Sequence, residues 1–335
     1  MQIARPLFYK LKGIKRQVTI LVFLHFTFSY FIVTIFNVIT FMPTNKIKIN
    51  LTKILALTLG LFILWPSFAL AATKIVEPQE IKEFKEYDLS ATTANAILVQ
   101  DVKSGKNLLD YNSDKVWSAA SLTKLMSALV FLDQGISFSA RTKLKAGDSV
   151  GGAELSANGY SLSARDLFNC SLMASTNNTV SALVRLSGLS KNNFVKRMNK
   201  KAKVLGMTSS TFVEPTGMDS KNLITAKDVT KLAITAFSNY NIRTVSARKN
   251  YTLSVKINRK FKTIKNVNKL LFESRLDIVG GKTGLLDESQ YNFTTIIRGP
   301  KNSRIAVTVL GANTWNDLFN ETQKLADWAT ANWQW

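Results

Sequence analysis

The chain has very few of the residues on which most hydrolytic and redox sites depend. Its 335 residues include one histidine, His25, and one cysteine, Cys170, and His25 lies in a long apolar stretch near the N-terminus. A Ser-His-Asp triad, a Cys-His pair and a zinc site each need a histidine or several thiolates at the reaction centre. These chemistries are therefore excluded, and we expect neither a metal ion nor a cofactor.

The single cysteine also excludes a disulfide within the chain, so stability must come from burial of a hydrophobic core. Hydrophobic residues make up 46% of the sequence, which is enough for one large domain or two smaller ones. The sequence contains no internal repeat and no low-complexity segment. We expect Cys170 to be a core residue.

Acidic residues are scarce relative to basic ones. The chain has 44 lysine and arginine residues against 22 aspartate and glutamate residues. Eight of the basic residues and none of the acidic ones lie in residues 1–71, which leaves 36 against 22, a net charge of +14, in the remainder. Such a surplus favours polyanionic surroundings, which for an exported protein are cell-wall polymers and anionic lipid head groups rather than nucleic acid. One basic group is expected to be only a solvated helix face: Lys196, Arg197, Lys200, Lys201 and Lys203.

Two apolar runs, residues 17–41 and 54–70, open the chain. The second has the three parts of a secretory signal: lysines ahead of it, an apolar centre, and an Ala-Leu-Ala sequence at residues 69–71. Met42 stands where an initiator is expected, so we interpret residues 1–41 as an upstream extension. The alternative makes the first run an extra membrane span, but a helical hairpin would then place the lysines between the runs outside, against the positive-inside tendency.

We therefore divide the chain into four segments. Residues 1–41 are the upstream extension or extra span, 42–71 a signal peptide, 72–91 a linker, and 92–335 one globular domain. The domain is expected beyond the cytoplasmic membrane, at its periplasmic or extracellular face or in the cell wall. An uncleaved N-terminal segment would act as a membrane tether.

Hydrophobic periodicity changes along this domain from strand to helix and back. Alternation with a period of two predicts strands at residues 96–102, 107–111, 253–257, 290–297 and 304–310. Helical spacing predicts helices beginning at Ser121 and covering residues 167–174, 193–204, 229–237 and 315–335. Sequences typical of a capping box, at residues 163–166 and 225–228, mark the starts of two of them. Strands at both ends with helices between them predict an α+β fold, in which an antiparallel sheet is flanked by helices and carries an inserted helical subdomain.

Three short motifs follow one another along the domain: Ser121-Leu122-Thr123-Lys124, Ser175-Thr176-Asn177 and Lys282-Thr283-Gly284. A serine hydroxyl is a poor nucleophile at neutral pH unless a neighbouring group accepts its proton. The i, i+3 spacing places Lys124 on the same helix face as Ser121, within hydrogen-bond reach. Lysine acts as a base only when its pKa is lowered, which burial and a second cation would both do; Lys282 is the candidate cation.

The other residues of the motifs are expected to form the walls of a cleft. On a strand, Lys282 supplies positive charge, Thr283 a hydroxyl for a substrate carboxylate, and Gly284 close access to the backbone. Ser175 and Asn177 form the opposite wall.

Each motif alone is weak, because the sequence also contains decoys. They are the Ser-x-x-Lys at 246–249, the Ser-x-Asn triplets at 156–158 and 190–192, and the Lys-Ser-Gly at 103–105. Context separates them from the three motifs: residues 103–105 are predicted to form a hairpin turn, Ser246 begins no apolar-periodic run, and Ser156 lies in a polar glycine-rich loop.

The ordered set resembles the penicilloyl serine transferases, and within them the low-molecular-mass penicillin-binding proteins of the D-alanyl-D-alanine carboxypeptidase family. Residues 120–126, Ala-Ser-Leu-Thr-Lys-Leu-Met, match the nucleophile box of that family almost letter for letter. Further matches are residues 205–207, 212–219, 225–228 and 281–284. The resemblance covers residues 92–330 and implies a β-lactamase/DD-peptidase-like (transpeptidase-like) fold.

The resemblance also implies roles. Ser121 would attack the carbonyl of the penultimate D-Ala of a peptidoglycan stem peptide with Lys124 as general base, and Ser175 would relay the proton to the leaving D-Ala amine. Asn177 would hold the amide of the acyl chain. Peptidoglycan stem peptides are then the partners, and β-lactam antibiotics covalent inhibitors.

For the remaining site residues, the resemblance implies that Lys282 and Thr283 receive the terminal carboxylate beside Gly284. The backbone N–H groups of Ser121 and Leu285 would form the oxyanion hole. Water would then hydrolyse the acyl-enzyme.

The sequence departs from the family pattern beside the three motifs. The positions concerned are Ser118, Ala119, Thr176, Asn178, Leu286, Ser289 and Gln290. Two alternatives to a carboxypeptidase follow: an endopeptidase that cuts cross-links with the same site, and a non-catalytic cell-wall-binding or regulatory module. A class A β-lactamase is disfavoured, because no Glu-x-x-Leu-Asn loop can be placed.

Overall fold

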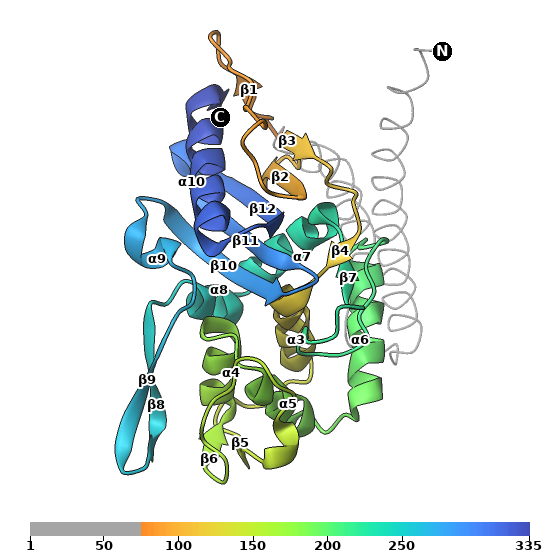
Figure 1. Ribbon diagram of the computed structural model, residues 1–335, viewed down its shortest axis with the longest axis vertical. Coiled ribbons are helices and arrows are strands. Elements are labelled where there is room, and N and C mark those ends of the chain that lie inside the picture. Colours follow the sequence, from red (N-terminus) through yellow and green to blue (C-terminus); the bar gives the residue numbers. More distant parts are fainter. Residues whose placement is uncertain (1–74) are drawn as a thin grey trace, which may run out of the picture. The chain divides into compact units, whose positions relative to one another are not determined.

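The computed structural model describes residues 75–335 (Figure 1). A five-stranded antiparallel sheet forms its centre, in the order β10-β11-β12-β2-β3. The strands are β2 (Ala96–Asp101), β3 (Asn107–Tyr111), β10 (Asp277–Leu286), β11 (Gln290–Arg298) and β12 (Arg304–Ala312). The N-terminal hairpin therefore completes a sheet whose other three strands come from the C-terminal part, and β2 pairs with β12 from Ala96↔Leu310 to Asp101↔Ile305.

Helices cover both faces of the sheet, and the alternation of side chains along β2 explains how. Ile97 and Val99 belong to one buried cluster with α10 (Trp315–Asn332), whereas Ala96 and Leu98 belong to the cluster on the other side. A strand with both faces covered buries consecutive residues, since successive side chains point to opposite faces. The helices of the second cluster are α3 (Thr123–Leu132), α4 (Ala164–Met173), α5 (Asn177–Leu186), α6 (Lys191–Val204), α7 (Ala226–Ser238) and α8 (Tyr240–Ser246). The predicted α+β fold is confirmed.

The predicted helix starts depend on local capping. Ser163 and Asp166 form a reciprocal capping box at the start of α4. Thr225 caps α7 by accepting from the backbone N–H of Asp228, but the Asp228 carboxylate turns away and accepts from Ser209 N at 2.9 Å instead. Both sequence signatures therefore mark true helix starts, and the second carboxylate also fixes a neighbouring loop.

Short elements complete the domain. The strand pairs outside the main sheet are β1 (Gln79–Glu80) with β13 (Trp333–Gln334), β4 (Trp117–Ser118) with β7 (Leu223–Ile224), β5 (Arg141–Lys143) with β6 (Ser161–Ser163), and β8 (Asn250–Ile257) with β9 (Lys260–Lys265). The short helices are η1 (Ala120–Leu122), η2 (Ala146–Asp148), α9 (Leu270–Glu273) and η3 (Pro300–Asn302). Cys170 is fully buried in the core, as predicted.

Both ends of the described chain differ in detail from the sequence prediction. The last helix ends at Asn332 rather than at the C-terminus, because residues 333–334 become a strand that pairs with β1. Part of the segment that we interpreted as a linker is therefore packed on the domain. Phe84 and Tyr87 make edge-on ring contacts with Trp328. The aromatic residues near the C-terminus serve packing, and Trp333 is buried.

The predicted upstream extension, 1–41, and signal peptide, 42–71, lie outside the described residues. In residues 75–335, no helix combines the length and the apolar composition needed to span a bilayer. The division into signal, linker and domain stays a prediction.

Candidate active site

Ser121 lies in the 3-10 turn η1, directly before α3, and its backbone is fixed by two glycines from distant segments. Ala120 has a φ of 44°, in the left-handed region. A Cβ on Gly217 would lie 2.0 Å from the carbonyl oxygen of Ala120, and one on Gly284 would lie 3.1 Å from that of Ala119. The strand of the third motif and the segment around Gly217 therefore touch the backbone on which Ser121 is held.

Lys124 is fully enclosed beneath Ser121. Its Nζ lies 2.7 Å from Ser121 Oγ, 2.6 Å from Asn177 Oδ1 and 2.6 Å from the carbonyl oxygen of Thr216. Burial lowers the pKa of Lys124 to about 7, although the nearby Glu214 carboxylate opposes this shift. A neutral amine keeps two N–H groups for the carbonyl oxygens of Asn177 and Thr216, which leaves its lone pair toward the Ser121 hydroxyl. The geometry is that of a general base beside a nucleophile.

The second motif joins α4 to α5 and directs Ser175 and Asn177 into the site. Ser175 has a φ of 57°, so the chain reverses there before α5 begins at Asn177. Asn177 Nδ2 donates to the carbonyl of Gly151 at 2.7 Å, which leaves its oxygen for Lys124. Ser175 Oγ instead accepts from Lys282 Nζ at 2.8 Å. The motif therefore connects the two lysines of the site.

Lys282, on β10, is as buried as Lys124. Its Nζ donates to Ser175 Oγ and, at 2.9 Å, to the carbonyl of Thr283. Burial holds the pKa of Lys282 well below its usual value, and the positive charge of Lys124 lowers it further. The two lysines thus interact electrostatically, but burial, and not the predicted charge of Lys282, lowers the pKa of Lys124. Thr283 is also buried, whereas Leu285, near the C-terminal end of β10, is 41% exposed.

Glu214 is a residue of this site that the sequence motifs did not single out. Its carboxylate accepts from Thr216 N and Thr216 Oγ1, both at 2.6 Å, from Met218 N at 2.9 Å, and from Gly217 N. Asn222 Nδ2 also donates to it at 2.8 Å. One carboxylate therefore fixes the turn that presents the Thr216 carbonyl to the buried lysine of the first motif.

The decoy motifs lie elsewhere. Ser246 ends α8 with a buried hydroxyl that has no hydrogen-bond partner, and Lys249 is exposed. Ser190 caps α6, and residues 103–105 form the turn between β2 and β3. These three decoys thus lie at a helix end, at a helix cap and in a turn, and the turn is the one that its sequence context predicted.

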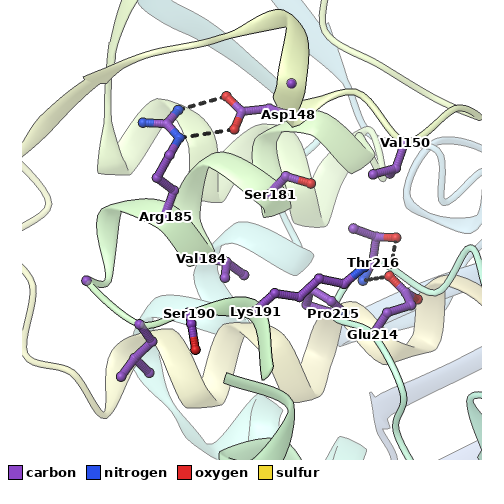
Figure 2. A pocket seen from close by; sticks show the side chains of 13 residues that line it. Asp148, Val150, Ser181, Val184, Arg185, Ser190, Lys191, Glu214, Pro215 and Thr216 are labelled. Atoms are coloured by element: carbon purple, nitrogen blue, oxygen red, sulfur yellow. Dashed lines mark hydrogen bonds and ion pairs between the residues drawn. The ribbon is translucent and has the colours of Figure 1, made fainter. Parts of the chain in front are cut away.

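A pocket of about 430 Å³ is lined in part by Glu214, Pro215 and Thr216, and not by Ser121. Figure 2 shows Glu214, Pro215 and Thr216 at one end and the Asp148–Arg185 ion pair, 2.8 Å long, at the other. None of the three motifs lines this pocket. The pocket therefore borders the turn that Glu214 fixes, and that turn contacts Lys124.

No group of three or more histidine, cysteine, aspartate or glutamate side chains within residues 75–335 is arranged to hold a metal ion. The polar groups gathered here are instead two lysines, two serines, an asparagine and a threonine. Such a set of groups can transfer a proton and bind an anion, and acyl transfer requires both capacities.

Comparison with known proteins agrees with the class that fold and motifs define. The family model for D-alanyl-D-alanine carboxypeptidase matches residues 82–314, and the chain belongs to this family of serine peptidases. A D-alanyl-D-alanine endopeptidase of Haemophilus influenzae is 32% identical over 227 residues, 66% of this chain and 76% of that protein. The D-alanyl-D-alanine carboxypeptidase DacF of Bacillus subtilis is 29% identical over 256 residues, 74% of this chain and 64% of that protein.

A solved structure extends the agreement to three dimensions. Penicillin-binding protein D2 of Listeria monocytogenes, in its ampicillin-bound form, is similar with a TM-score of 0.64 and 30% identity. The match covers 72% of this chain and 99% of that one. The predicted DD-peptidase-like fold and the family assignment are confirmed.

Proposed function

We propose that the protein hydrolyses the D-Ala-D-Ala bond at the end of peptidoglycan stem peptides through an acyl-enzyme on Ser121. The observation that carries this proposal is the 2.7 Å contact between Ser121 Oγ and the buried Lys124 Nζ, whose pKa is lowered to about 7. Lys124 takes the hydroxyl proton while the Ser121 oxygen bonds to the carbonyl carbon of the penultimate D-Ala. The base is thus matched to neutral pH.

The second half of the acylation, in which the terminal D-Ala leaves, also uses Ser175 and Asn177 on the opposite wall of the cleft. The carbon–nitrogen bond breaks, and the terminal D-Ala leaves as an amine that takes up the proton by way of Lys124 and Ser175. Asn177 holds the amide of the acyl chain, while Lys282 and Thr283 bind the carboxylate of the terminal residue. Water then attacks the ester and regenerates Ser121.

The developing oxyanion would be held by the backbone N–H groups of Ser121 and Leu285. The close approach of Gly284 to Ser121, whose backbone nitrogen would lie 3.3 Å from a Cβ at that glycine, supports this assignment. Such a donor is typically worth about 3 to 4 kcal/mol of transition-state stabilisation.

Cleavage of cross-links is the second candidate function, and one observation favours it. The Haemophilus influenzae relative described above is an endopeptidase at 32% identity. The chemistry at Ser121 would be identical, with a cross-linked amine as leaving group instead of free D-Ala.

The proposed setting is the cell wall. Stem peptides lie outside the cytoplasmic membrane, so the domain would act there as an exported or N-terminally tethered protein. We infer that β-lactams acylate Ser121, which is supported by the ampicillin complex of the Listeria monocytogenes protein.

A fluorescent penicillin and defined muropeptides test the proposal. The full chain, purified in detergent, is expected to carry the label on Ser121 by peptide mapping, and Ser121→Ala to lose it with an unchanged circular dichroism spectrum. Release of D-Ala from a pentapeptide supports the carboxypeptidase, and conversion of a cross-linked dimer to monomers supports the endopeptidase. Absence of label on well-folded protein would favour the non-catalytic wall-binding module.

A further inference from the structure

The β8–β9 hairpin is a basic surface feature of the described chain that the proposed chemistry does not use. Figure 1 shows it projecting from the body of the domain, beyond α8 and α9. Residues 248–265 contain seven basic residues and no acidic one. They are Arg248, Lys249, Lys256, Arg259, Lys260, Lys262 and Lys265.

The charges of this hairpin are not neutralised within the described domain. No ion pair in residues 75–335 involves it, whereas Lys201 of α6 pairs with Asp133 at 2.7 Å. Some of its cations lie over aromatic rings: Lys256 is 5.4 Å from the centre of the Phe261 ring, and Lys265 is 4.6 Å from that of Phe272. Phe261 is itself 58% exposed. The surface therefore presents free positive charge beside apolar rings.

The base of the hairpin is fixed next to the active site. Asp166 on α4 accepts from Tyr251 Oη at 2.8 Å and from Ser254 N at 2.9 Å. Directly after β9, Val267 N donates to the carbonyl of Met173 at 2.9 Å, two residues before Ser175. A ligand that lies along the hairpin would thus run toward the wall formed by the second motif.

We propose that the β8–β9 hairpin binds polymeric peptidoglycan through the free carboxylates of stem peptides that neighbour the one being cut. This inference rests on the proposed function and names the form of substrate that the site meets. The polymer carries carboxylates at regular intervals, which complements a row of unpaired cations; a short soluble peptide ends before it reaches them. The hairpin should therefore affect turnover of the polymer and not the chemistry at Ser121.

Two matched variants of the full chain test this proposal. The hairpin variant replaces four exposed cations, as Lys256→Gln, Arg259→Gln, Lys260→Gln and Lys265→Gln. The control variant removes the same charge from α6, as Lys196→Gln, Arg197→Gln, Lys200→Gln and Lys203→Gln. Both are compared with the unchanged protein in co-sedimentation with purified sacculi, in hydrolysis of a soluble pentapeptide and in acylation by fluorescent penicillin.

The hairpin variant is expected to bind sacculi about tenfold more weakly at low salt, since four exposed ion pairs contribute a few tenths of a kcal/mol each. Its acylation and pentapeptide hydrolysis should stay unchanged, and the control variant should lose less than about twofold. Equal losses in both variants, or no loss in the hairpin variant, would overturn the proposal.

A second arm separates the polymer from a membrane. If the hairpin variant loses binding to phosphatidylglycerol vesicles but keeps binding to sacculi, the surface recognises lipid and the proposal fails. Failure of the proposed function shows differently, because the unchanged protein would then not be acylated by penicillin, whatever its affinity for sacculi.

Discussion

Two equally buried lysines lie in one site, yet their surroundings differ. Lys124 and Lys282 are each 1% exposed, and burial lowers both pKa values. The Glu214 carboxylate partly opposes the shift at Lys124, whereas Lys282 faces the charge of Lys124. Lys124 Nζ contacts Ser121 Oγ in the turn before α3, whereas Lys282 Nζ contacts Ser175 Oγ in the turn before α5. Under the proposed function, Lys124 would act as a base and Lys282 would bind an anion, and the difference would come from their neighbours rather than from their burial.

Replacing each lysine by arginine is the sharpest way to break this comparison. Arginine keeps the charge but is not deprotonated in proteins, so Lys124→Arg should reduce penicillin acylation by about 10² to 10⁴-fold. Lys282→Arg keeps the function of binding a carboxylate and should cost about tenfold. Stopped-flow acylation rates measure both. Equal losses would mean that the two lysines do not differ in role.

Gly217→Ala should damage the turn that contacts the backbone beside Ser121 and presents the Thr216 carbonyl to Lys124. Its φ of 87° disfavours a side chain, and the new Cβ would lie 2.0 Å from the Ala120 carbonyl oxygen. We expect the free energy of unfolding to fall by about 3 kcal/mol. Gly206→Ala is the control, because its φ is 69° but nothing lies within 4 Å of the added atom; it should cost about 1 kcal/mol. Chemical denaturation measures both, and similar losses would show that the contact with Ala120 is unimportant.

Glu214→Gln should sharpen the comparison through pH. Acylation requires neutral Lys124, so its rate in the unchanged protein should rise with pH through about 7. Removing the carboxylate removes the effect that raises the pKa of Lys124, so the acid limb should move to lower pH. Because glutamine also offers amide hydrogens to the N–H groups of the turn, the plateau rate should fall about tenfold. The pH profile of acylation measures both effects, and a lower rate with an unmoved limb would restrict Glu214 to a structural role.

The smallest effect is expected at the decoy serine. Ser246→Ala removes a buried hydroxyl without a partner, so stability should stay within about 1 kcal/mol and acylation should not change. A thermal melt and a labelling assay measure these. Loss of labelling would mean that Ser246, and not Ser121, is the nucleophile.

Much of the fold and the motif residues could be predicted because their signals are local. Alternating side chains gave β3 at its true bounds, and the Ser163–Asp166 pair marked the start of α4. Ser121 and Lys124 are three residues apart, so one helical turn fixes their contact. Family resemblance supplied the expected roles of the other motif residues, but not the hydrogen bonds from Lys124 to Asn177 and from Lys282 to Ser175.

What escaped prediction depends on contacts between distant segments. The role of Glu214 arises from the way its turn packs under α3, and no periodicity in residues 212–219 indicates that packing. The pairing of β1 with β13 joins the two ends of the described chain. An isolated pair of two-residue strands has no detectable pattern of its own. The hairpin beyond α8 had a sequence signal in its basic residues, but only its position beside the second motif gives that signal meaning.

The pairing of β2 with β12 has a consequence for the order of folding. The strand that opens the sheet meets its partner only after nearly all of the domain has been made, and contacts of such long range form slowly. Until β12 has been made, β2 and β3 cannot join β10 and β11 in one sheet. The strand that carries the third motif therefore lies in an incomplete sheet while the chain is incomplete. A chain that crosses a membrane N-terminus first would thus lack its complete sheet until the last strand arrives, and under the proposed function would react with a β-lactam only then.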